Sequence, residues 1–238
     1  MRPRTARRSV TLHERARRER VLERAAAVAA ACRKCEIGYQ RRNNVYGEGD
    51  PCARLIVIGE GPGESEDLLG RPFVGRAGEL LNKMLAAIDL PREDVYICNT
   101  VKCRPTLNEG GKLKNRAPTP TEMENCRPYL DEQITVIAPQ VILALGAPAA
   151  KSFLGRTFSI MNGRGRWYEG PNGIPLMVTF HPAYVLRQGG TALTDTKRQV
   201  WSDLKKVREK LEALSGPKDE ARREASEPLA EALTLFEL

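Results

Sequence analysis

A short apolar run followed by a glycine-rich turn is the feature that most constrains the fold of this chain. Leu55–Ile58 is predicted to form a buried strand, Gly59–Asp67 the turn that leaves it, and Glu79–Ile88 the following helix. Such a turn lies at the carboxyl end of a parallel strand, where α/β sheets place ligands. A dinucleotide fingerprint is excluded, because Glu64 stands where a third glycine is needed and the neighbouring carboxylates would repel a pyrophosphate.

Further apolar runs predict three more strands, at Val95–Cys98, Val141–Leu145 and Leu176–Thr179. Segments with helical periodicity separate these strands. A strand followed by a helix is therefore predicted four times along the chain. This order is typical of an α/β fold with a parallel sheet between helices and right-handed crossovers. A chain of 238 residues that is 41% hydrophobic can bury one core of this kind.

The helical segments carry a start signal and one expected break. Thr11–Ala31 and Lys197–Leu214 place apolar residues at helical spacing, which predicts helices with one packed face. Thr119–Glu122 has the pattern of a capping box at a helix start. Pro128 lies inside that helix, so we expect the helix to kink or split there.

Charge divides the chain into three expected parts: a basic arm with the start of the first helix (1–24), one domain (25–214) and a flexible acidic tail (215–238). The formal charge is +8, which suits a polyanionic partner without proving one. Nine arginines and three glutamates occupy residues 1–24, so the arm either contacts phosphates or is simply solvated. Without a membrane-length apolar run or a signal-peptide core, we expect a soluble cytoplasmic protein.

Six cysteines suggest metal binding or buried thiols rather than disulfides. Four of them form two candidate pairs, one spaced as Cys-x-x-Cys and one in which each cysteine precedes Arg-Pro: Cys32, Cys35, Cys103 and Cys126. Spacing alone does not separate zinc from an iron-sulfur cluster, since both accept four cysteines. Cys52 and Cys98 lie beside or within apolar strands and are interpreted as small buried hydrophobic residues.

Polar and glycine residues follow the predicted strands at the edge where their carboxyl ends meet. Glu60, Asn99 and Gly146 each follow an apolar run. His181 follows the fourth run and opens a loop, whereas the other histidine, His13, lies in the basic helix. This placement favours a functional role for His181 over a structural one. An asparagine after a strand is less distinctive, because it often only turns the chain.

Five ordered motifs resemble the family 4 uracil-DNA glycosylases, which are the iron-sulfur members of their superfamily. The resemblance runs from about Cys32 to Leu214 and rests on Gly59-Glu60-Gly61-Pro62-Gly63, Arg71-Pro72-Phe73-Val74-Gly75, Asn99-Thr100-Val101-Lys102-Cys103-Arg104-Pro105, Cys126-Arg127-Pro128-Tyr129-Leu130 and His181-Pro182-Ala183-Tyr184-Val185-Leu186-Arg187. It implies a three-layer α/β/α sandwich around a four-stranded parallel sheet. It also implies a [4Fe-4S] cluster held by the four paired cysteines.

The chain departs from the family pattern in three places. Gly61 stands where alanine is usual, which suggests a looser turn or more room for water. An insertion, Thr106–Asn115, contains the basic residues Lys112 and Lys114, which we interpret as phosphate contacts. A related branch that bonds covalently to DNA has a longer basic loop here with a histidine, which this chain lacks. The added termini are the third departure.

The resemblance and the chemistry together assign roles to the strand-end residues. Phe73 offers a face on which a flipped base can stack, and Gly59 and Gly61 border the uracil site. The Asn99 amide can accept from N3–H of uracil and donate to O4, whereas cytosine presents the reverse pattern. His181 would donate to O2, where negative charge develops as the glycosidic bond breaks.

The resemblance says less about which residues position the attacking water and which contact the DNA duplex. Glu60 is expected to position the water or support the cationic sugar, and otherwise to brace the turn through hydrogen bonds to the backbone. Leu186 is the expected wedge in the duplex and Arg187 a phosphate contact, unless Leu186 simply packs on the core.

The resulting hypothesis is a monomeric, monofunctional enzyme that removes uracil from single- and double-stranded DNA, in the cytoplasm at the nucleoid. The alternatives are a glycosylase for hypoxanthine or xanthine, or a non-catalytic iron-sulfur DNA-binding protein. The tail ends in an apolar cluster that resembles peptides docking on the bacterial sliding clamp, with anchors at Leu233, Leu235 and Phe236. Alternatively, this stretch packs as a short helix on the enzyme's own surface.

Overall fold

The computed structural model describes residues 11–214, and it contains a central sheet of six strands in the order β1-β3-β2-β6-β8-β7. The four inner strands pair in parallel, which confirms the α/β prediction. They are β3 (Tyr96–Asn99), β2 (Leu55–Gly59), β6 (Val141–Leu145) and β8 (Pro175–Thr179). Residues 1–10 of the predicted basic arm lie outside the described residues. The whole predicted tail, 215–238, also lies outside them, and with it the predicted sliding-clamp anchors Leu233, Leu235 and Phe236.

Two short antiparallel strands at the sheet edges were not predicted, so the expectation of a four-stranded sheet was wrong. These are β1 (Glu48–Gly49), which pairs with β3, and β7 (Trp167–Glu169), which pairs with β8. Strands of two and three residues are too short to show a period in the sequence. Glycine is also untypical of strands, so Gly49 gives no strand signal in the sequence. The structure requires glycine there, because a Cβ would lie 2.0 Å from the Val95 carbonyl oxygen.

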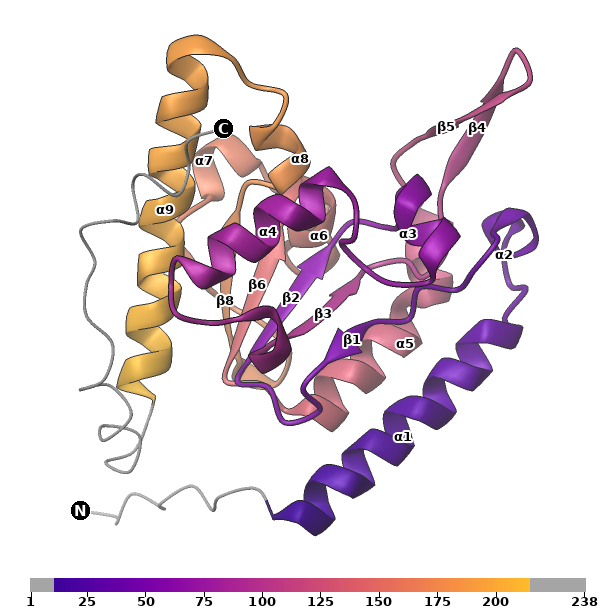
Figure 1. The fold of residues 1–238 in the computed structure, drawn as a ribbon, viewed down its shortest axis with the longest axis horizontal. Coiled ribbons are helices and arrows are strands. Elements are labelled where there is room, and N and C mark those ends of the chain that lie inside the picture. Colours follow the sequence, from indigo (N-terminus) through magenta and orange to yellow (C-terminus); the bar gives the residue numbers. More distant parts are fainter. Residues whose placement is uncertain (1–10, 215–238) are drawn as a thin grey trace.

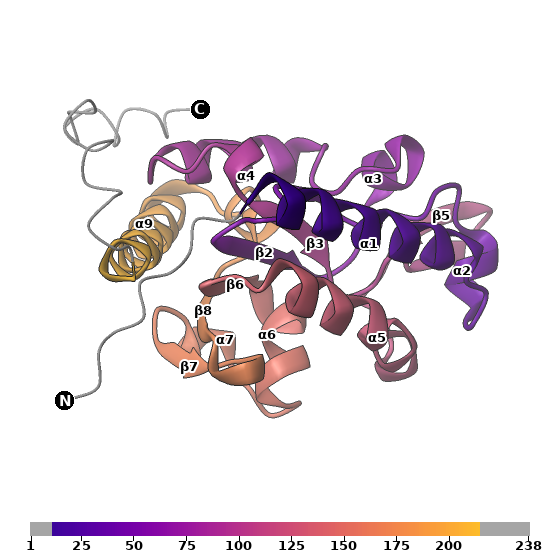
Figure 2. The ribbon, with the colours of Figure 1, turned by 90° about the horizontal axis from the view of Figure 1, so that it is seen from below.

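Helices cover both faces of the sheet (Figures 1 and 2). In Figure 2, α4 lies on one side of the strands and α5 and α6 on the other. The helices are α1 (Leu12–Ala31), α2 (Glu36–Gln40), α3 (Glu64–Leu69), α4 (Arg76–Ala86), α5 (Pro120–Ile137), α6 (Gly146–Leu154), α7 (Ile160–Gly163), α8 (Pro182–Val185) and α9 (Gly190–Ala213), with 3-10 turns at Arg92–Asp94 and Pro171–Gly173.

The alternating side chains of β2 divide the core into two clusters. Leu55 and Val57 face one cluster together with residues of α4 and α9, while Ile56 and Ile58 face the other with residues of α1 and α5. Because both faces are covered by helices, the inner strands are apolar throughout, as buried parallel strands are. The apolar face predicted for α9 is buried in the first cluster.

The predicted helix starts are confirmed by hydrogen bonds. Thr11 caps α1 by accepting from the Glu14 backbone N–H at 3.2 Å. Thr119 and Glu122 form the capping box of α5, at 3.2 and 2.7 Å. The helix is not split at Pro128 but continues to Ile137. A proline costs a helix one hydrogen bond, and the burial of the residues after Pro128 against the sheet outweighs that loss.

The insertion folds into a hairpin of β4 (Thr106–Glu109) and β5 (Lys112–Asn115), which projects from the body of the molecule (Figure 1). Gly110 and Gly111 form its two-residue turn with φ of 61° and 81°. Both values lie in the left-handed region, which glycine adopts without strain and which suits the twist of a hairpin. The Asn108 side chain accepts from the Gly111 N–H at 3.0 Å and closes the turn.

Candidate active site

A cavity of about 700 Å³ opens where the inner strands end. Its wall contains seven of the residues singled out from the sequence: Glu60, Gly61, Phe73, Asn99, Gly146, His181 and Arg187. The convergence follows from the parallel sheet, because the turns after β2, β3, β6 and β8 all leave the same edge. The residues expected at this edge after the four strands, Glu60, Asn99, Gly146 and His181, do lie around one cavity.

Glu66 holds the glycine turn in shape. Its carboxylate accepts backbone N–H bonds from Gly63 at 3.1 Å and from Val74 and Gly75 at 2.9 Å each. One side chain thereby ties the start of α3 to the segment that carries Phe73. The sequence analysis does not predict this role, because it treats the carboxylates of the turn only as charges that repel phosphate. The signal was available, since a glutamate three residues after a helix cap is the partner expected in a capping box.

Phe73 and Gly59 shape the cavity beside Asn99. Phe73 has φ of 51°, unusual for a residue with a side chain, and its ring stacks on His181 with centroids 5.5 Å apart. A Cβ on Gly59 would lie 2.4 Å from Asn99 Oδ1 and 2.5 Å from the Phe73 ring. Gly59 is therefore not a lining residue of the cavity but lies beneath Phe73 and Asn99. Because it has no side chain, Phe73 and Asn99 can lie together. Gly78 permits the unusual backbone, since a Cβ there would lie 1.9 Å from the Phe73 carbonyl oxygen.

Asn99 presents an unpaired acceptor. The residue is 2% exposed, and among the described residues its Oδ1 has no hydrogen-bond partner. A buried polar atom without a partner costs about 1–3 kcal/mol, so native proteins rarely keep one without a functional reason. An N–H group of a ligand in the cavity would satisfy this oxygen.

His181 caps α8 rather than opening an irregular loop, which corrects the sequence expectation. Its Nδ1 accepts from the Ala183 N–H at 3.1 Å, and this bond assigns the ring proton to Nε2. Burial, with a smaller contribution from the Arg187 cation, lowers the pKa of His181 to about 4. At neutral pH the ring is therefore an uncharged donor through Nε2–H, which has no partner in residues 11–214.

Glu60 lines the cavity as a half-buried carboxylate. Burial raises its pKa, and the Arg187 cation partly opposes that rise. No group among residues 11–214 donates a hydrogen bond to this carboxylate, so the expected bracing of the turn is performed by Glu66 instead. Gly61 does not leave extra room: a Cβ there would lie 2.8 Å from Val101 Cγ2. The looser turn expected from this glycine is not what the structure has.

The two predicted DNA contacts after His181 lie in different surroundings: Arg187 lines the cavity, and Leu186 packs against the core. Arg187 is exposed and belongs to the cavity wall. Leu186 is half-buried and packs against the core cluster of α4 and α9, as in the alternative interpretation. Tyr184, which the sequence analysis did not single out, lines the cavity and stacks on Phe180 at 4.7 Å.

The hairpin meets the cavity at its root. Asn115 and Arg116 belong to the cavity wall, and neither was predicted to do so. Asn115 Oδ1 accepts from Arg104 at 2.7 Å, and Arg116 binds both oxygens of Glu122 at 2.6 and 2.7 Å. Lys112 and Lys114, farther out on β5, are exposed, and Lys114 pairs with Glu109 at 2.7 Å.

The four paired cysteines come from three segments beside α1 and α5. Burial raises the pKa of Cys35 and the pKa of Cys126. The nearby Cys103 thiol contributes to both rises, so the three thiols lie close enough to interact. Cys103 Sγ accepts from Arg41 at 2.8 Å and from Asn44 at 3.9 Å. In the part of the chain that the structure describes, no three His, Cys, Asp or Glu side chains are arranged to hold a single metal ion.

The two remaining cysteines differ from each other. Cys98 is fully buried within β3, as predicted. Cys52 is only half-buried, so its interpretation as a buried residue was wrong. It lies in the turn before β2, where its backbone N–H bonds to the Asp50 side chain at 2.9 Å.

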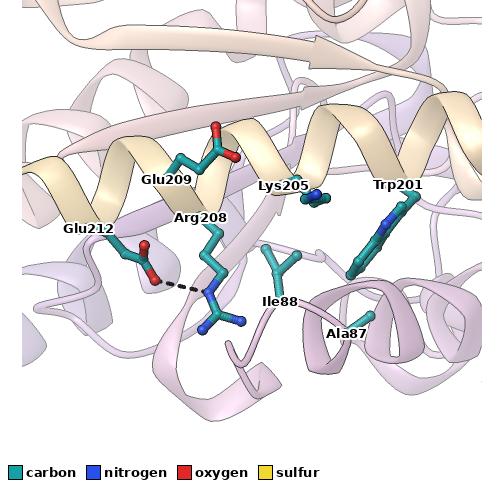
Figure 3. Close-up of a pocket in the computed structure, with 7 residues that line it drawn as sticks. All are labelled: Ala87, Ile88, Trp201, Lys205, Arg208, Glu209 and Glu212. Atoms are coloured by element: carbon teal, nitrogen blue, oxygen red, sulfur yellow. Dashed lines mark hydrogen bonds and ion pairs between the residues drawn. The ribbon is translucent and has the colours of Figure 1, made fainter. Parts of the chain in front are cut away.

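A second hollow of about 190 Å³ lies between the end of α4 and α9 (Figure 3). Trp201 and Ile88 face each other across it, and Arg208 binds Glu212 at 3.0 Å on its rim. None of the residues predicted to act on a substrate lines this hollow. The candidate active site is therefore the larger cavity.

Comparisons with known proteins agree with this geometry. The family model described as the Uracil DNA glycosylase superfamily matches residues 46–205. The chain is 43% identical to the Type-4 uracil-DNA glycosylase of Thermotoga maritima over 80% of this chain and 95% of that protein. It is 41% identical to the Type-4 enzyme of Archaeoglobus fulgidus, over 75% and 87% of the two chains.

A third relative, the Type-4 uracil-DNA glycosylase of Sulfurisphaera tokodaii, is 40% identical over 79% of this chain and 84% of its own. The Type-5 enzyme of Thermus thermophilus is more distant, at 27%. The chain belongs to the uracil-DNA glycosylase superfamily, and within it to the type-4 family.

Proposed function

We propose that this protein removes uracil from DNA by hydrolysing the bond between the base and its sugar, which leaves an abasic site for repair. The observation that carries the proposal is the unpaired, buried Asn99 Oδ1 in the wall of the cavity, next to the stacked rings of Phe73 and His181. A cavity with an aromatic ring and an unpaired acceptor in its wall suits a planar base with an N–H group.

Recognition begins with extrusion of the base, because the bond to be cleaved is inaccessible inside a duplex. The Phe73 ring stacks on the extruded base, a contact worth about 1–3 kcal/mol. Asn99 accepts from N3–H of uracil through Oδ1 and donates to O4 through its amide. Cytosine offers an acceptor at N3 and donors at N4, so it would leave these groups mismatched. A polar mismatch of this kind rejects a wrong base by roughly four orders of magnitude.

Bond cleavage leaves negative charge on the uracil ring, chiefly at O2. His181 donates to that oxygen through Nε2–H and stabilises the charge as it develops. A neutral donor is suitable, because its contribution arises in the transition state and needs no proton transfer. The backbone bond from Ala183 keeps the ring oriented with Nε2 free for this contact.

Glu60 is the carboxylate we assign to the attacking water or to the cationic sugar. The support for this role is its half-buried position on the cavity wall with no hydrogen bond from residues 11–214. Its raised pKa also suits a group that accepts a proton from water. Gly61 borders the cavity through its backbone, and Gly59 contributes by lacking a side chain, which lets Phe73 and Asn99 lie together.

The DNA strand is proposed to cross the rim of the cavity. Arg187 contacts a phosphate on one side, and Lys112 and Lys114 on the projecting hairpin reach phosphates farther along. Leu186 would enter the space left by the base only after leaving its place on the core.

The four cysteines are proposed to hold a [4Fe-4S] cluster. Two features of the chain fit it: a set of four thiols, and N–H donors to one of the sulfurs, since the Arg41 and Asn44 side chains both donate to Cys103. When bound, the group joins α1, α2, the loop after β3 and α5. Four cysteines leave no position for substrate, so its role is structural.

Further parts of the proposal concern the surroundings of the enzyme. It acts as a monomer on single- and double-stranded DNA, in the cytoplasm at the nucleoid. No helix within residues 11–214 is long and apolar enough to cross a membrane. Docking on a sliding clamp through Leu233, Leu235 and Phe236 stays a prediction on residues outside the described part.

The proposal is tested with a panel of oligonucleotides that carry uracil, hypoxanthine, xanthine or an undamaged base at one position, both single- and double-stranded. We expect release of uracil from both forms, little from hypoxanthine or xanthine, and no strand cleavage without alkali. Preferred release of a deaminated purine would instead support the broader glycosylase, and binding without any release would support a non-catalytic protein.

A further inference from the structure

Lys102 is a fully buried lysine with two close partners. It is 1% exposed, and its Nζ donates to the Asn99 backbone oxygen at 2.7 Å and to Gln133 Oε1 at 2.6 Å. Its ammonium lies 5.7 Å from the centroid of the Tyr46 ring. Gln133 is fully buried in α5 and donates onward to the Tyr46 carbonyl at 2.8 Å. A lysine side chain is rarely buried to this degree unless its nitrogen is hydrogen-bonded, as it is here.

The bond from Lys102 fills a gap in the sheet at Asn99. On one side, β2 pairs with β3 along its length, and Gly59 is opposite Asn99. On the other side, β1 pairs with Tyr96 and Ile97, and no strand in the described part of the chain reaches the last residue of β3 there. The Asn99 carbonyl takes its hydrogen bond from the Lys102 side chain instead.

The same residue is tied to the cysteine site. The next residue in the chain is Cys103, and the Lys102 backbone N–H lies near enough to the Cys126 thiol to oppose the rise in pKa that burial causes there. The Lys102 carbonyl accepts from the Val45 N–H at 2.8 Å, which fixes the segment that follows α2. Lys102 is thus in direct contact with the cysteine site through its backbone and with the base-reading residue through its side chain.

We propose that Lys102 is the positioning residue of Asn99 and that it is the physical connection through which the cysteine site holds the uracil-reading amide in place. This inference rests on the proposed reading of uracil by Asn99. It gives the cysteine site a second consequence besides stability: the position of the base reader depends on the segment that the cysteines fix. Because Asn99 Oδ1 has no hydrogen-bond partner within residues 11–214, its orientation depends on how well its backbone is held.

The test compares Lys102→Met, which keeps the length of the side chain without its donors, with Lys102→Arg, which keeps a charged donor. The substrate is a single-stranded oligonucleotide with one uracil, and free uracil is added as a competing inhibitor. For Lys102→Met we expect at least a tenfold lower kcat and at least tenfold weaker inhibition by uracil. The KM should change less than threefold, since phosphate contacts supply most of the DNA affinity. Lys102→Arg should recover part of both losses.

Two controls separate positioning from a loss of stability. Val207→Ala removes methyl groups from the core on α9, away from the cavity, and should leave inhibition by uracil unchanged while lowering the melting temperature. Iron content should be unchanged in Lys102→Met. If that variant does not fold, Gln133→Leu takes its place and should weaken inhibition by uracil at least threefold, because Lys102 loses its second partner.

The outcomes distinguish this inference from the function on which it rests. Unchanged inhibition by uracil in Asn99→Ala would contradict the proposed reading of uracil itself. Weakened inhibition in Asn99→Ala together with unchanged inhibition in Lys102→Met would overturn only the role of Lys102. Loss of iron in Lys102→Met would also overturn it, because the residue would then serve the cysteine site alone.

Discussion

Replacing His181 with alanine is expected to lower kcat at least about a hundredfold, the usual cost of losing a donor to a developing oxyanion. The KM for DNA should change little, because the lost contact forms mainly in the transition state. The measurement is single-turnover release of uracil from an oligonucleotide. His13→Ala is the matched control, since His13 is the other histidine and lies exposed on α1. A rate near that of the unsubstituted protein in His181→Ala would mean that the charge is stabilised elsewhere.

The pH profile gives a second measure of the same residue. With a folded pKa of about 4, His181 is neutral throughout the range from pH 6 to 8, so it should cause no change in rate there. The unfolded chain binds a proton near the ordinary pKa of about 6.5, and the folded chain does not. Folding stability should therefore fall as the pH drops from about 6.5 toward 4. A rate that followed a group titrating near pH 7 and disappeared in His181→Ala would instead indicate a protonated histidine.

Replacing Cys103 with alanine is expected to remove the iron and to destabilise the fold by more than about 4 kcal/mol, beyond the range of most point substitutions. Cys103 is buried between Arg41 and Asn44, and a methyl group there would leave the Arg41 guanidinium without its sulfur partner. Iron and sulfide analysis, visible absorbance and thermal unfolding measure the effect. Cys52→Ala is the control, because that cysteine lies outside the proposed set and should keep the iron. Full iron content in Cys103→Ala, or stoichiometric zinc in the unsubstituted protein, would contradict the cluster assignment.

The inner strands and the main site residues could be predicted because their signals are local. Each inner strand is a run of apolar residues, and the residues that follow meet at one edge by the geometry of a parallel sheet. The capping box at Thr119 is likewise visible within four residues. The sequence therefore predicts correctly that Asn99 and His181 lie at one edge of the sheet, which is where the cavity opens.

The parts that were missed depend on contacts between distant segments. Lys102 resembled one more basic residue in a motif, and only the fold shows that it is buried between Asn99 and Gln133. Asn115 reaches the cavity because the insertion is a hairpin whose root lies there. Leu186 was assigned to DNA from its place in a motif, although burial against α4 and α9 decides its position in the free protein.

The most direct test of the central claim, that Asn99 reads uracil in this cavity, is uracil release from two oligonucleotides that differ only by uracil or cytosine at one position. The intact protein should release uracil and leave cytosine in place, and Asn99→Ala should release uracil at least about a hundredfold more slowly. Release at an unchanged rate by Asn99→Ala, or no release by the intact protein, would contradict the account.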